Sequence, residues 1–351
     1  MFDKFFKKFS KDVGIDLGTS NTLIYLKDRG IVVSEPSIVA LNDRTGQILA
    51  VGQEAKRMIG KAPAHITITK PLVDGIISDF EVTEKMLKYF IDRTRDKNFS
   101  FASRPRVVVG VPLDVTEVEK KAVEDVVLSA GAREVFLVEN VISTAVGARL
   151  PIQDPSGCMV VDIGGGLTQI AVISLSGVVS WRSLKIAGNK LDQDIMEFAR
   201  TEFNLLTGEG IAEEIKKKAG QVKEDQKPVE LKMQGRDIIS GLPKEITASS
   251  EQIMQSIQRS VNSIIEAIKT TIEITPPELV ADIYRRGLIL SGGGSMLAGI
   301  DEVIRQATKI PVKVIEDPLT CSVRGIGLIL EDDQLLKEVA IPSTQDEQSP
   351  R

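Results

Sequence analysis

The chain has 351 residues, of which 42% are hydrophobic and 26% charged, a balance typical of a folded protein with room for two domains. Its formal net charge of −5 argues against nucleic acid as a partner. Two cysteines without C-x-x-C spacing and a single histidine argue against a zinc site or a disulfide framework. Because no apolar run reaches the roughly 20 residues of a membrane span and no secretory signal is visible, we expect a cytoplasmic protein.

Residues 1–12 predict a short amphipathic helix. Four phenylalanines recur at i, i+3, i+4 and i+7, and lysines flank them: Phe2, Phe5, Phe6 and Phe9, with Lys4, Lys7 and Lys8. This composition is typical of a helix that lies in a membrane surface, with its lysines on anionic headgroups. The alternative is a helix that packs on the protein's own core. An array of such weak anchors on a polymer would bind tightly, which links this segment to self-assembly.

A glycine-bearing β-hairpin is predicted next. Its first strand ends at Asp16, and its turn holds four small or polar residues: Gly18, Thr19, Ser20 and Asn21. Glycine lets backbone N–H groups approach an anion, the polar side chains add donors, and the aspartate suits Mg²⁺ held through water. Alone, this hairpin would be read as an ordinary tight turn.

The same pattern recurs in the second half of the chain. Asp162 ends an apolar strand, and Gly164, Gly165 and Gly166 form the turn, so both copies read Asp-x-Gly-x-x-x-Thr. Two such hairpins would grip a polyphosphate from both sides. The repeat therefore predicts Mg-ATP bound in a cleft between two related α/β domains.

A third glycine turn follows a buried strand at residues 287–291. It consists of Gly292, Gly293, Gly294 and Ser295 and precedes a predicted helix. A strand, a glycine turn and a helix start allow backbone to lie against a nucleotide, which predicts the adenosine end of the site. Before it, residues 251–274 place apolar side chains on one helical stripe, which predicts a core helix.

In this order, the motifs resemble the bacterial MreB family of actin-like proteins along nearly the whole chain. The matching stretches are IDLGTSNTLIY, VGVPLDVTEVEKKAVEDV, GAREVFLVE, MVVDIGGG, PPELVADIYRRG, LSGGGSML and EDPLT. The resemblance implies the actin fold, with two lobes built on duplicated ribonuclease H-like domains that each carry a smaller inserted subdomain. It also implies paired protofilaments on the anionic inner face of the cell membrane. There they would act with membrane proteins of cell-wall elongation to determine cell shape.

The resemblance implies a division of the chain into five parts. These are a membrane helix (1–12), domain I (13–150, small subdomain about 33–75), domain II (151–324, small subdomain about 183–245), a return helix to domain I (325–338) and a disordered tail (339–351).

Further site residues follow from the family's motifs. The helix beside the ribose and base would carry Glu213, Glu214 and Lys216. Phe99 and Phe101 fall where the family has an apolar insertion loop, and they predict a second membrane contact. Packing of both rings against the domain is an equal alternative.

The chain departs from the family at the residue that positions the attacking water. The family reads L-I-E-E-P, whereas this chain reads L-V-E-N-V, so Asn140 occupies the catalytic glutamate position. Glu139 is adjacent, but one residue at a helix start turns a side chain by about 100°. Near the γ-phosphate, the family's GGGTTE and AGDE become GGGLTQ and AGNK, which introduce Gln169 and Lys190. We expect slow hydrolysis, because an amide can bind water but cannot accept its proton.

Two other functions share parts of this pattern. A nucleotide-gated scaffold that does not polymerise would carry the same turns. A small-molecule kinase of this fold would also carry them, but it needs an acceptor pocket with a catalytic base. The basic and aromatic N-terminus favours a filament on a membrane.

Overall fold

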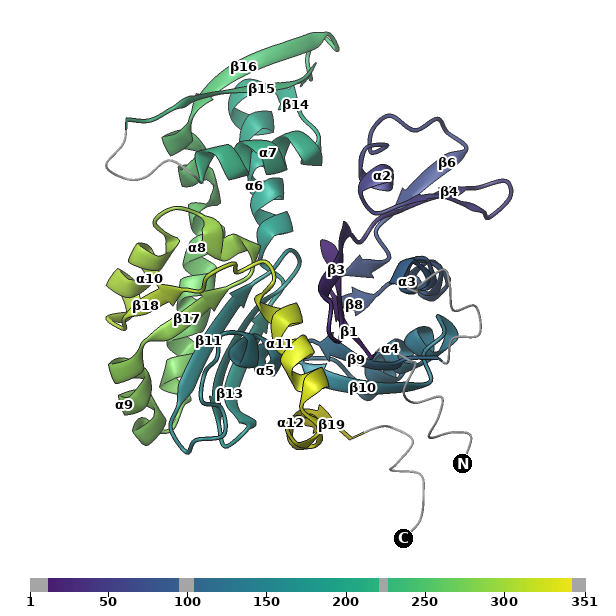
Figure 1. Ribbon diagram of the computed structural model, residues 1–351. Coiled ribbons are helices and arrows are strands. Elements are labelled where there is room, and N and C mark those ends of the chain that lie inside the picture. The colour runs from purple at the N-terminus through teal and green to yellow at the C-terminus, as the bar shows by residue number, and fades with distance from the viewer. Residues whose placement is uncertain (1–11, 95–103, 221–226, 343–351) are drawn as a thin grey trace. The chain divides into compact units, whose positions relative to one another are not determined.

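The computed structural model describes residues 12–94, 104–220 and 227–342. The chain divides into two compact units (Figure 1): unit 1 comprises Met1–Cys158, Ile173–Val179 and Leu319–Arg351, and unit 2 comprises Met159–Val172 and Ser180–Pro318. The predicted N-terminal helix and the loop with Phe99 and Phe101 lie outside the described residues. Among the helices that the structure does describe, none has the length and apolarity to cross a membrane.

Unit 1 is built on a six-stranded sheet with the order β19-β10-β9-β1-β2-β3. Its strands are β1 (Val13–Leu17), β2 (Asn21–Leu26), β3 (Gly30–Pro36), β9 (Arg106–Val111), β10 (Glu134–Glu139) and β19 (Ala340–Ile341). Its helices are α2 (Gln53–Lys56), α3 (Phe80–Thr94), α4 (Glu117–Ser129), α5 (Asn140–Gly147), α11 (Cys321–Glu331) and α12 (Asp333–Val339). Smaller sheets are formed by β4 (Val39–Asn42), β5 (Ile48–Val51) and β6 (Ile66–Thr69), and by β7 (Leu72–Val73) and β8 (Ile76–Ile77).

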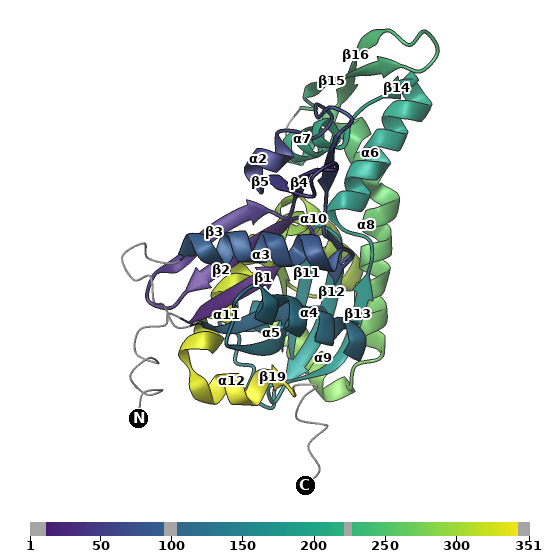
Figure 2. The same ribbon diagram turned by 90° about the vertical axis from the view of Figure 1, so that its right-hand side faces the viewer.

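The two faces of the six-stranded sheet carry different partners. Side chains alternate between faces along a strand, and Val13, Ile15 and Leu17 of β1 share a core with residues of α3 and α4. Figure 2 shows α3 lying across this sheet. Gly14, on the other face, lies against Ile326 of α11. Because Asp16 lies two residues after Gly14, it belongs to the α11 face, opposite the core.

Unit 2 repeats this arrangement. Its five-stranded sheet has the order β13-β12-β11-β17-β18, which matches β3-β2-β1-β9-β10 of unit 1. In both sheets a parallel strand pairs with the first strand of the hairpin: β9 with β1, and β17 with β11. The strands are β11 (Cys158–Ile163), β12 (Thr168–Ser174), β13 (Gly177–Leu184), β17 (Leu288–Ser291) and β18 (Val312–Val314). The predicted duplication of an α/β fold is confirmed.

The remaining elements of unit 2 flank this sheet and extend beyond it. They are α6 (Gly188–Phe203), β14 (Leu205–Leu206), α7 (Glu209–Ala219), β15 (Glu230–Asp237), β16 (Pro243–Ser249), α8 (Ser250–Glu273), α9 (Pro277–Arg286), η1 (Gly293–Met296) and α10 (Ile300–Thr308). β14, β15 and β16 form a separate three-stranded sheet.

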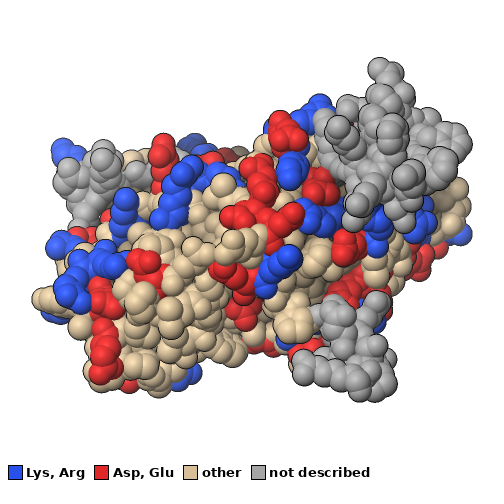
Figure 3. Space-filling view, turned by 60° about the horizontal axis from the view of Figure 1, so that its bottom comes forward, with Lys and Arg blue, Asp and Glu red and all other residues tan. Residues whose placement is uncertain are grey.

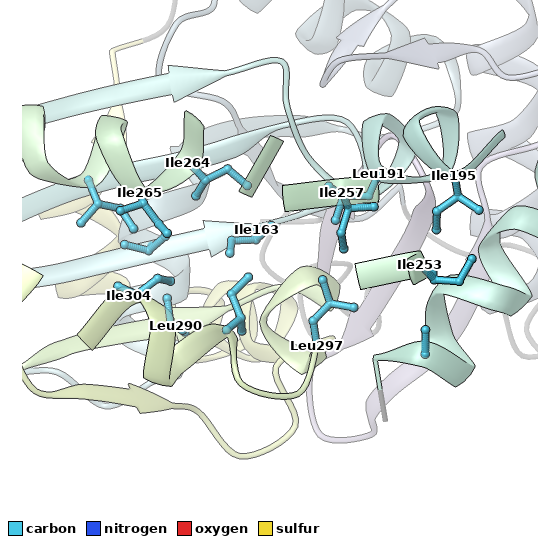
Figure 4. Packing of buried hydrophobic residues seen from close by; sticks show 14 of the residues in the cluster. Ile163, Leu191, Ile195, Ile253, Ile257, Ile264, Ile265, Leu290, Leu297 and Ile304 are labelled. Atoms are coloured by element: carbon cyan, nitrogen blue, oxygen red, sulfur yellow. The ribbon is translucent and has the colours of Figure 1, made fainter. Parts of the chain in front are cut away.

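The core of unit 2 lies between its five-stranded sheet and α8 (Figure 4). Ile253, Ile257, Ile264 and Ile268 are buried on one stripe of α8, which confirms the predicted core helix. In β11, Met159, Val161 and Ile163 enter the same core. Asp162 therefore lies on the opposite face of its sheet, as Asp16 does in unit 1.

The C-terminal segments differ from the predicted return helix and tail. Two helices replace the single helix expected at 325–338: α11 already begins at Cys321, and α12 follows after a break. Asp332 caps α12, because its side chain accepts hydrogen bonds from the N–H groups of Gln334 and Leu335. Ala340 and Ile341, which were predicted to lie in a disordered tail, form β19 and pair with β10.

Charged side chains of both signs are interspersed on the face shown in Figure 3. Many pairs are local, such as Lys121–Asp125 and Glu302–Arg305, which lie one turn apart on their helices. Such exposed pairs contribute little to the free energy of unfolding, so the two cores are its main source.

Gly325 tests the packing of α5 against α11. A Cβ added there would overlap the carbonyl oxygen of Ser143, so Gly325→Ala must separate the two helices. We expect a loss of about 1–3 kcal/mol in the free energy of unfolding, measured by urea denaturation. Gly210→Ala in α7 is the control: nothing lies within 4 Å of its added Cβ, and we expect a gain of up to about 1 kcal/mol. Equal effects of both changes would contradict this account.

Candidate nucleotide-binding site

The turn between β1 and β2, residues Gly18 to Asn21, is named loop 1. The Gly18 N–H donates to the carbonyl oxygen of Asn21 at 3.1 Å, which closes the turn. A Cβ on Gly18 would lie 2.7 Å from that same oxygen, so only glycine fits without a shift of the backbone. The turn requires glycine at this position because the backbone of Gly18 lies so close to the backbone of Asn21.

Loop 1 is braced from two sides. The Ser37 hydroxyl donates to the Gly18 carbonyl oxygen at 2.6 Å and also bonds the hydroxyl of Thr22 at 2.9 Å. The Gly75 N–H, between β7 and β8, donates to Oγ1 of Thr19 at 2.7 Å. A hydroxyl that accepts from a backbone N–H can still donate its own hydrogen to a phosphate oxygen. The loop is thus held in shape, as a preorganised anion site requires.

The turn between β11 and β12, residues Gly164 to Leu167, is named loop 2 and has the same closure. The Gly164 N–H donates to the Leu167 carbonyl oxygen at 2.9 Å. In the described part of the chain, neither Gly165 nor Gly166 uses its N–H in a hydrogen bond with another residue. Successive N–H groups in a glycine turn form a concavity that suits a phosphate.

The first turn of α6 holds loop 2 in place through backbone hydrogen bonds. The N–H groups of Gly188 and Asn189 donate to the carbonyl oxygens of Gly164 at 3.1 Å and Gly165 at 2.8 Å. The Thr168 hydroxyl donates to the Ile186 carbonyl oxygen at 2.6 Å. The motif threonine is therefore a brace in both loops, Thr22 through Ser37 and Thr168 through Ile186. The sequence motif identified the position of this threonine but did not predict that its hydroxyl would stabilise the loop.

Asp162 lies beside the third glycine turn. It is in register with Ser291 of β17, and a Cβ on Gly292 would lie 3.0 Å from its Oδ1. Gly292 has φ +78°, a conformation that glycine adopts without strain. Burial raises the pKa of Asp162 to about 6, against the opposing effect of the Ser291 hydroxyl. A cation at this carboxylate would offset the cost of its burial.

The third turn is stabilised by its own serine. The Ser295 hydroxyl, which is buried, donates to the Gly292 carbonyl oxygen at 2.7 Å. Ser295 was predicted to hold adenosine, but its hydroxyl donates within the turn.

In unit 1, three residues near the end of the sheet lie together. Asp16 is in register with Gly110 of the neighbouring β9, and Oδ1 of Asn140 lies directly over Gly110, where a Cβ would overlap it. This oxygen is buried and accepts no hydrogen bond within the described residues. Gly110 was not predicted as a site residue, although it lies in the VGVP stretch. Its missing side chain makes room for Asn140.

Glu139 has different neighbours from Asn140. It is the N-cap residue of α5, and burial raises the pKa of its carboxyl, while Lys120 of α4 lowers it. Lys120 lies on α4, which packs on the core face of the sheet, whereas the Asn140 side chain lies over Gly110 of β9. The predicted turn between the two side chains agrees with this difference.

The predicted ribose-side residues lie on α7. Glu213 and Glu214 each accept from the lysine one turn later, Lys217 and Lys218, at 2.6 Å. The Lys216 ammonium instead lies 2.9 Å from Oδ1 of Asp192 in α6, and both side chains are largely buried. Asp192 was missed by sequence reasoning, because nothing in its local sequence marks it as the partner of a lysine in another helix.

The residues present fit a magnesium nucleotide. Each unit carries a closed glycine loop and one aspartate at the end of a buried strand, on the face away from the core. No group of three or more His, Cys, Asp or Glu side chains in the described part of the chain could hold a metal ion by itself. Mg²⁺ bound with a nucleotide takes one or two carboxylates, several waters and phosphate oxygens, and Asp16 and Asp162 are carboxylates of the kind that would serve it.

Asp162→Asn tests the burial of this carboxylate in the nucleotide-free chain. A folded-state pKa raised to about 6 means that ionisation of Asp162 opposes folding. The contribution of this carboxyl to the free energy of unfolding is therefore greatest at low pH and is lost as the pH rises through 6. We expect Asp162→Asn to raise the free energy of unfolding at pH 7.5 by on the order of 2 kcal/mol. The gain should shrink toward pH 4 in urea titrations. The exposed Asp154→Asn is the control, and a pH-independent effect at Asp162 would contradict the assignment.

Known proteins match this chain over nearly its full length. A family model described as MreB/Mbl protein matches residues 10–338. The cell shape-determining protein Mbl of Bacillus subtilis (strain 168) is 46% identical over 330 residues, covering 94% of this chain and 98% of the relative. The cell shape-determining protein MreB of Escherichia coli (strain K12) is 45% identical over 335 residues, covering 94% and 96%.

Solved structures agree with these sequence matches. MreB5 of Spiroplasma citri bound to ADP superimposes with a TM-score of 0.88 at 35% identity, covering 97% of this chain and 99% of that one. The MamK double helical filament gives a TM-score of 0.76 at 23% identity, covering 92% and 99%, which shows the fold alone. The fold is therefore actin-like, and the chain belongs to the MreB/Mbl family.

Proposed function

We propose that this chain binds Mg-ATP and assembles into actin-like filaments that help to determine cell shape. The observation that carries the proposal is the duplicated loop, closed by the same glycine hydrogen bond in two sheets of the same strand order. Its relatives support it: MreB5 was solved with ADP and with AMPPNP, and the Mbl and MreB relatives are named cell shape-determining proteins.

Each loop has a defined task in nucleotide binding. Loop 1 offers its backbone and polar side chains to the phosphates, and loop 2 offers the N–H groups of Gly165 and Gly166. Asp16 and Asp162 would hold Mg²⁺ through its waters, and the ion would neutralise phosphate charge. Glycines 292–294 would lie against the adenosine, and Glu213 would lie near the ribose. These assignments follow from the chemistry of the residues and from the family's motifs.

We also propose that hydrolysis is slow. The buried Oδ1 of Asn140 can accept a hydrogen bond from a water and so orient it. An amide cannot take the proton that this water must lose on attack, and a missing base typically costs a factor of about 10² to 10⁴. Glu139 should not replace it, because Glu139 is in register with the core residue Val111 and therefore lies on the opposite face of the sheet from Gly110. Filaments of this chain should therefore persist after ATP binding.

Asn140→Glu tests this explanation. The carboxylate would extend past Gly110 from the same backbone position, and we expect phosphate release to rise by about tenfold or more, because a positioned base is restored. Release from filaments is measured under saturating Mg-ATP. Glu139→Gln is the matched control and should leave the wild-type rate unchanged. If the glutamate gives no gain, or if Glu139→Gln abolishes release, Asn140 is not the cause of slow turnover.

Membrane binding is proposed for the segments outside the described residues. The phenylalanines and lysines of residues 2–9, with Phe99 and Phe101, have the composition of interfacial anchors. Filaments would lie on the inner face of the membrane, and membrane proteins of cell-wall elongation would be their partners. Many weak anchors on one polymer would bind with high avidity, so assembly and membrane binding should strengthen each other.

One experiment separates the candidate functions. Wild-type chain is incubated with Mg-ATP and anionic liposomes, filaments are viewed by electron microscopy, and phosphate release is measured in the same sample. We expect filaments on the liposomes with little phosphate release. Liposome binding without filaments would favour a non-polymerising scaffold. ATP-dependent phosphorylation of small alcohols would favour a kinase of this fold.

A further inference from the structure

Gln169 carries a buried amide whose nitrogen has no hydrogen-bond partner. The residue lies on β12, one position after the bracing Thr168, and is 2% exposed. Its Nε2 atom is buried and makes no hydrogen bond within the described part of the chain. Burying an amide N–H without an acceptor costs free energy, so a buried amide normally has either a structural partner or a ligand. For Gln169, no structural partner lies among the described residues.

Gln169 lies on the same face of its sheet as Asp162. Its neighbours along β12, Ile170 and Val172, belong to the core of unit 2. Ile170 is one residue away and Val172 is three, and side chains alternate between faces along a strand, so Gln169 lies on the face opposite the core. Asp162 lies on that face for the same reason. The amide is therefore on the side of the sheet where the nucleotide is proposed to bind.

The register of the hairpin places Gln169 opposite Asp162. In unit 1, Asp16 is in register with Leu23, two positions away from the hydrogen bond that closes loop 1. Loop 2 has the same length and the same closing hydrogen bond, so the same count pairs Asp162 with Gln169. Side chains directly opposite each other on antiparallel strands have Cβ atoms about 4.5–5.5 Å apart. The unpartnered amide thus lies beside the carboxylate that is proposed to hold Mg²⁺ through water.

The two hairpins differ in chemistry at this position. Leu23, beside Asp16 in unit 1, is a buried apolar residue that needs no hydrogen-bond partner. Gln169, beside Asp162 in unit 2, brings a hydrogen-bond donor to the equivalent place. Asp162 does not accept from this donor, because Nε2 makes no hydrogen bond within the described residues. Of the two hairpins, only that of unit 2 therefore presents a side-chain amide donor beside its aspartate.

A phosphate oxygen is the acceptor that suits these surroundings. Gly165 and Gly166 of loop 2 have N–H groups that make no hydrogen bond with another residue in the described part of the chain. Several donors near one turn suit an anion with several oxygens. The Asp162 carboxylate would repel such an anion unless a cation lay between them, whereas a neutral amide attracts it through its N–H. A donor beside the metal-binding carboxylate is thus compatible with a phosphate that also binds the metal.

We propose that Nε2 of Gln169 donates a hydrogen bond to a phosphate oxygen of the bound nucleotide. Gln169 is then a phosphate-binding residue outside the glycine loops, and it contacts the phosphate directly rather than through Mg²⁺. The proposal rests on the proposed binding of Mg-ATP and adds a donor to it. Until the nucleotide binds, the chain bears the free-energy cost of the buried, unpartnered amide.

The first test measures the ATP affinity of the full chain with and without Mg²⁺. ATP displaces a fluorescent ATP analogue in a buffer with either excess Mg²⁺ or EDTA. For Gln169→Leu, which introduces the side chain of the equivalent Leu23, we expect the affinity to fall by about tenfold in both buffers, because a hydrogen bond to a charged oxygen is lost. Gln255→Leu, at an exposed position of α8, should change neither affinity. A loss confined to the Mg²⁺ buffer would show that the amide serves the metal and its waters, and would overturn the proposal.

The second test measures the stability of the nucleotide-free chain. Leucine removes a buried donor that has no partner, so Gln169→Leu should raise the urea concentration at the midpoint of unfolding while it weakens ATP binding. A structural role for the amide would not produce effects of opposite sign. A lower midpoint, or a variant that does not fold, would show that the amide stabilises the chain itself and would overturn the proposal.

Gln169→Glu adds a control of charge. It keeps the size of the side chain but replaces the donor with a carboxylate, so in EDTA it should bind ATP more weakly than Gln169→Leu does. Affinity equal to that of the wild-type chain in EDTA would contradict a phosphate contact. Wild-type chain that binds no ATP in either buffer would contradict the proposed function. Wild-type chain that binds ATP, with Gln169→Leu unaffected in both buffers, would contradict this inference alone.

Discussion

The two glycine turns depend on one constraint, the approach of a glycine N–H to the carbonyl oxygen three residues further along. This contact closes loop 1 at Gly18 and loop 2 at Gly164. An added Cβ would lie 2.7 Å from the acceptor oxygen at Gly18 and 3.1 Å from it at Gly164, so both positions favour a residue without a side chain. The strand before each turn determines where the aspartate lies. Its apolar residues enter the core on one face of the sheet, so the aspartate next to the turn must lie on the other face.

Hydrogen bonds from neighbouring residues hold both turns in place. Loop 1 is held by Ser37 and Gly75, and loop 2 by the first turn of α6. A site whose donors are already fixed spends little free energy on ordering when an anion arrives. In the proposed function, nucleotide binding would depend on the two loops, whereas hydrolysis would depend on the single position held by Asn140.

The sequence predicted the parts of this structure that are local. Strand alternation, the glycine turns and the isoleucine stripe of α8 each follow from spacing within a short window, and the structure confirms all three. The duplicated motif also predicted the duplicated sheet. By contrast, the contacts of Asn140 with Gly110 and of Lys216 with Asp192 join residues far apart in the chain. No periodicity reports such pairs, because they depend on how the elements pack. The C-terminal segment was misjudged for a similar reason, since Ala340 and Ile341 form a strand only by pairing with β10.

Calorimetric titration of Mg-ATP into the wild-type chain and into Gly18→Ala and Gly164→Ala tests the central claim most directly. An added Cβ would lie 2.7 Å from the Asn21 oxygen in the first variant and 3.1 Å from the Leu167 oxygen in the second. The account predicts saturable binding to the wild-type chain and a loss of affinity of about tenfold or more in each variant, with Gly210→Ala unchanged. Equal affinity in all four chains would contradict the claim that the two loops form the nucleotide site.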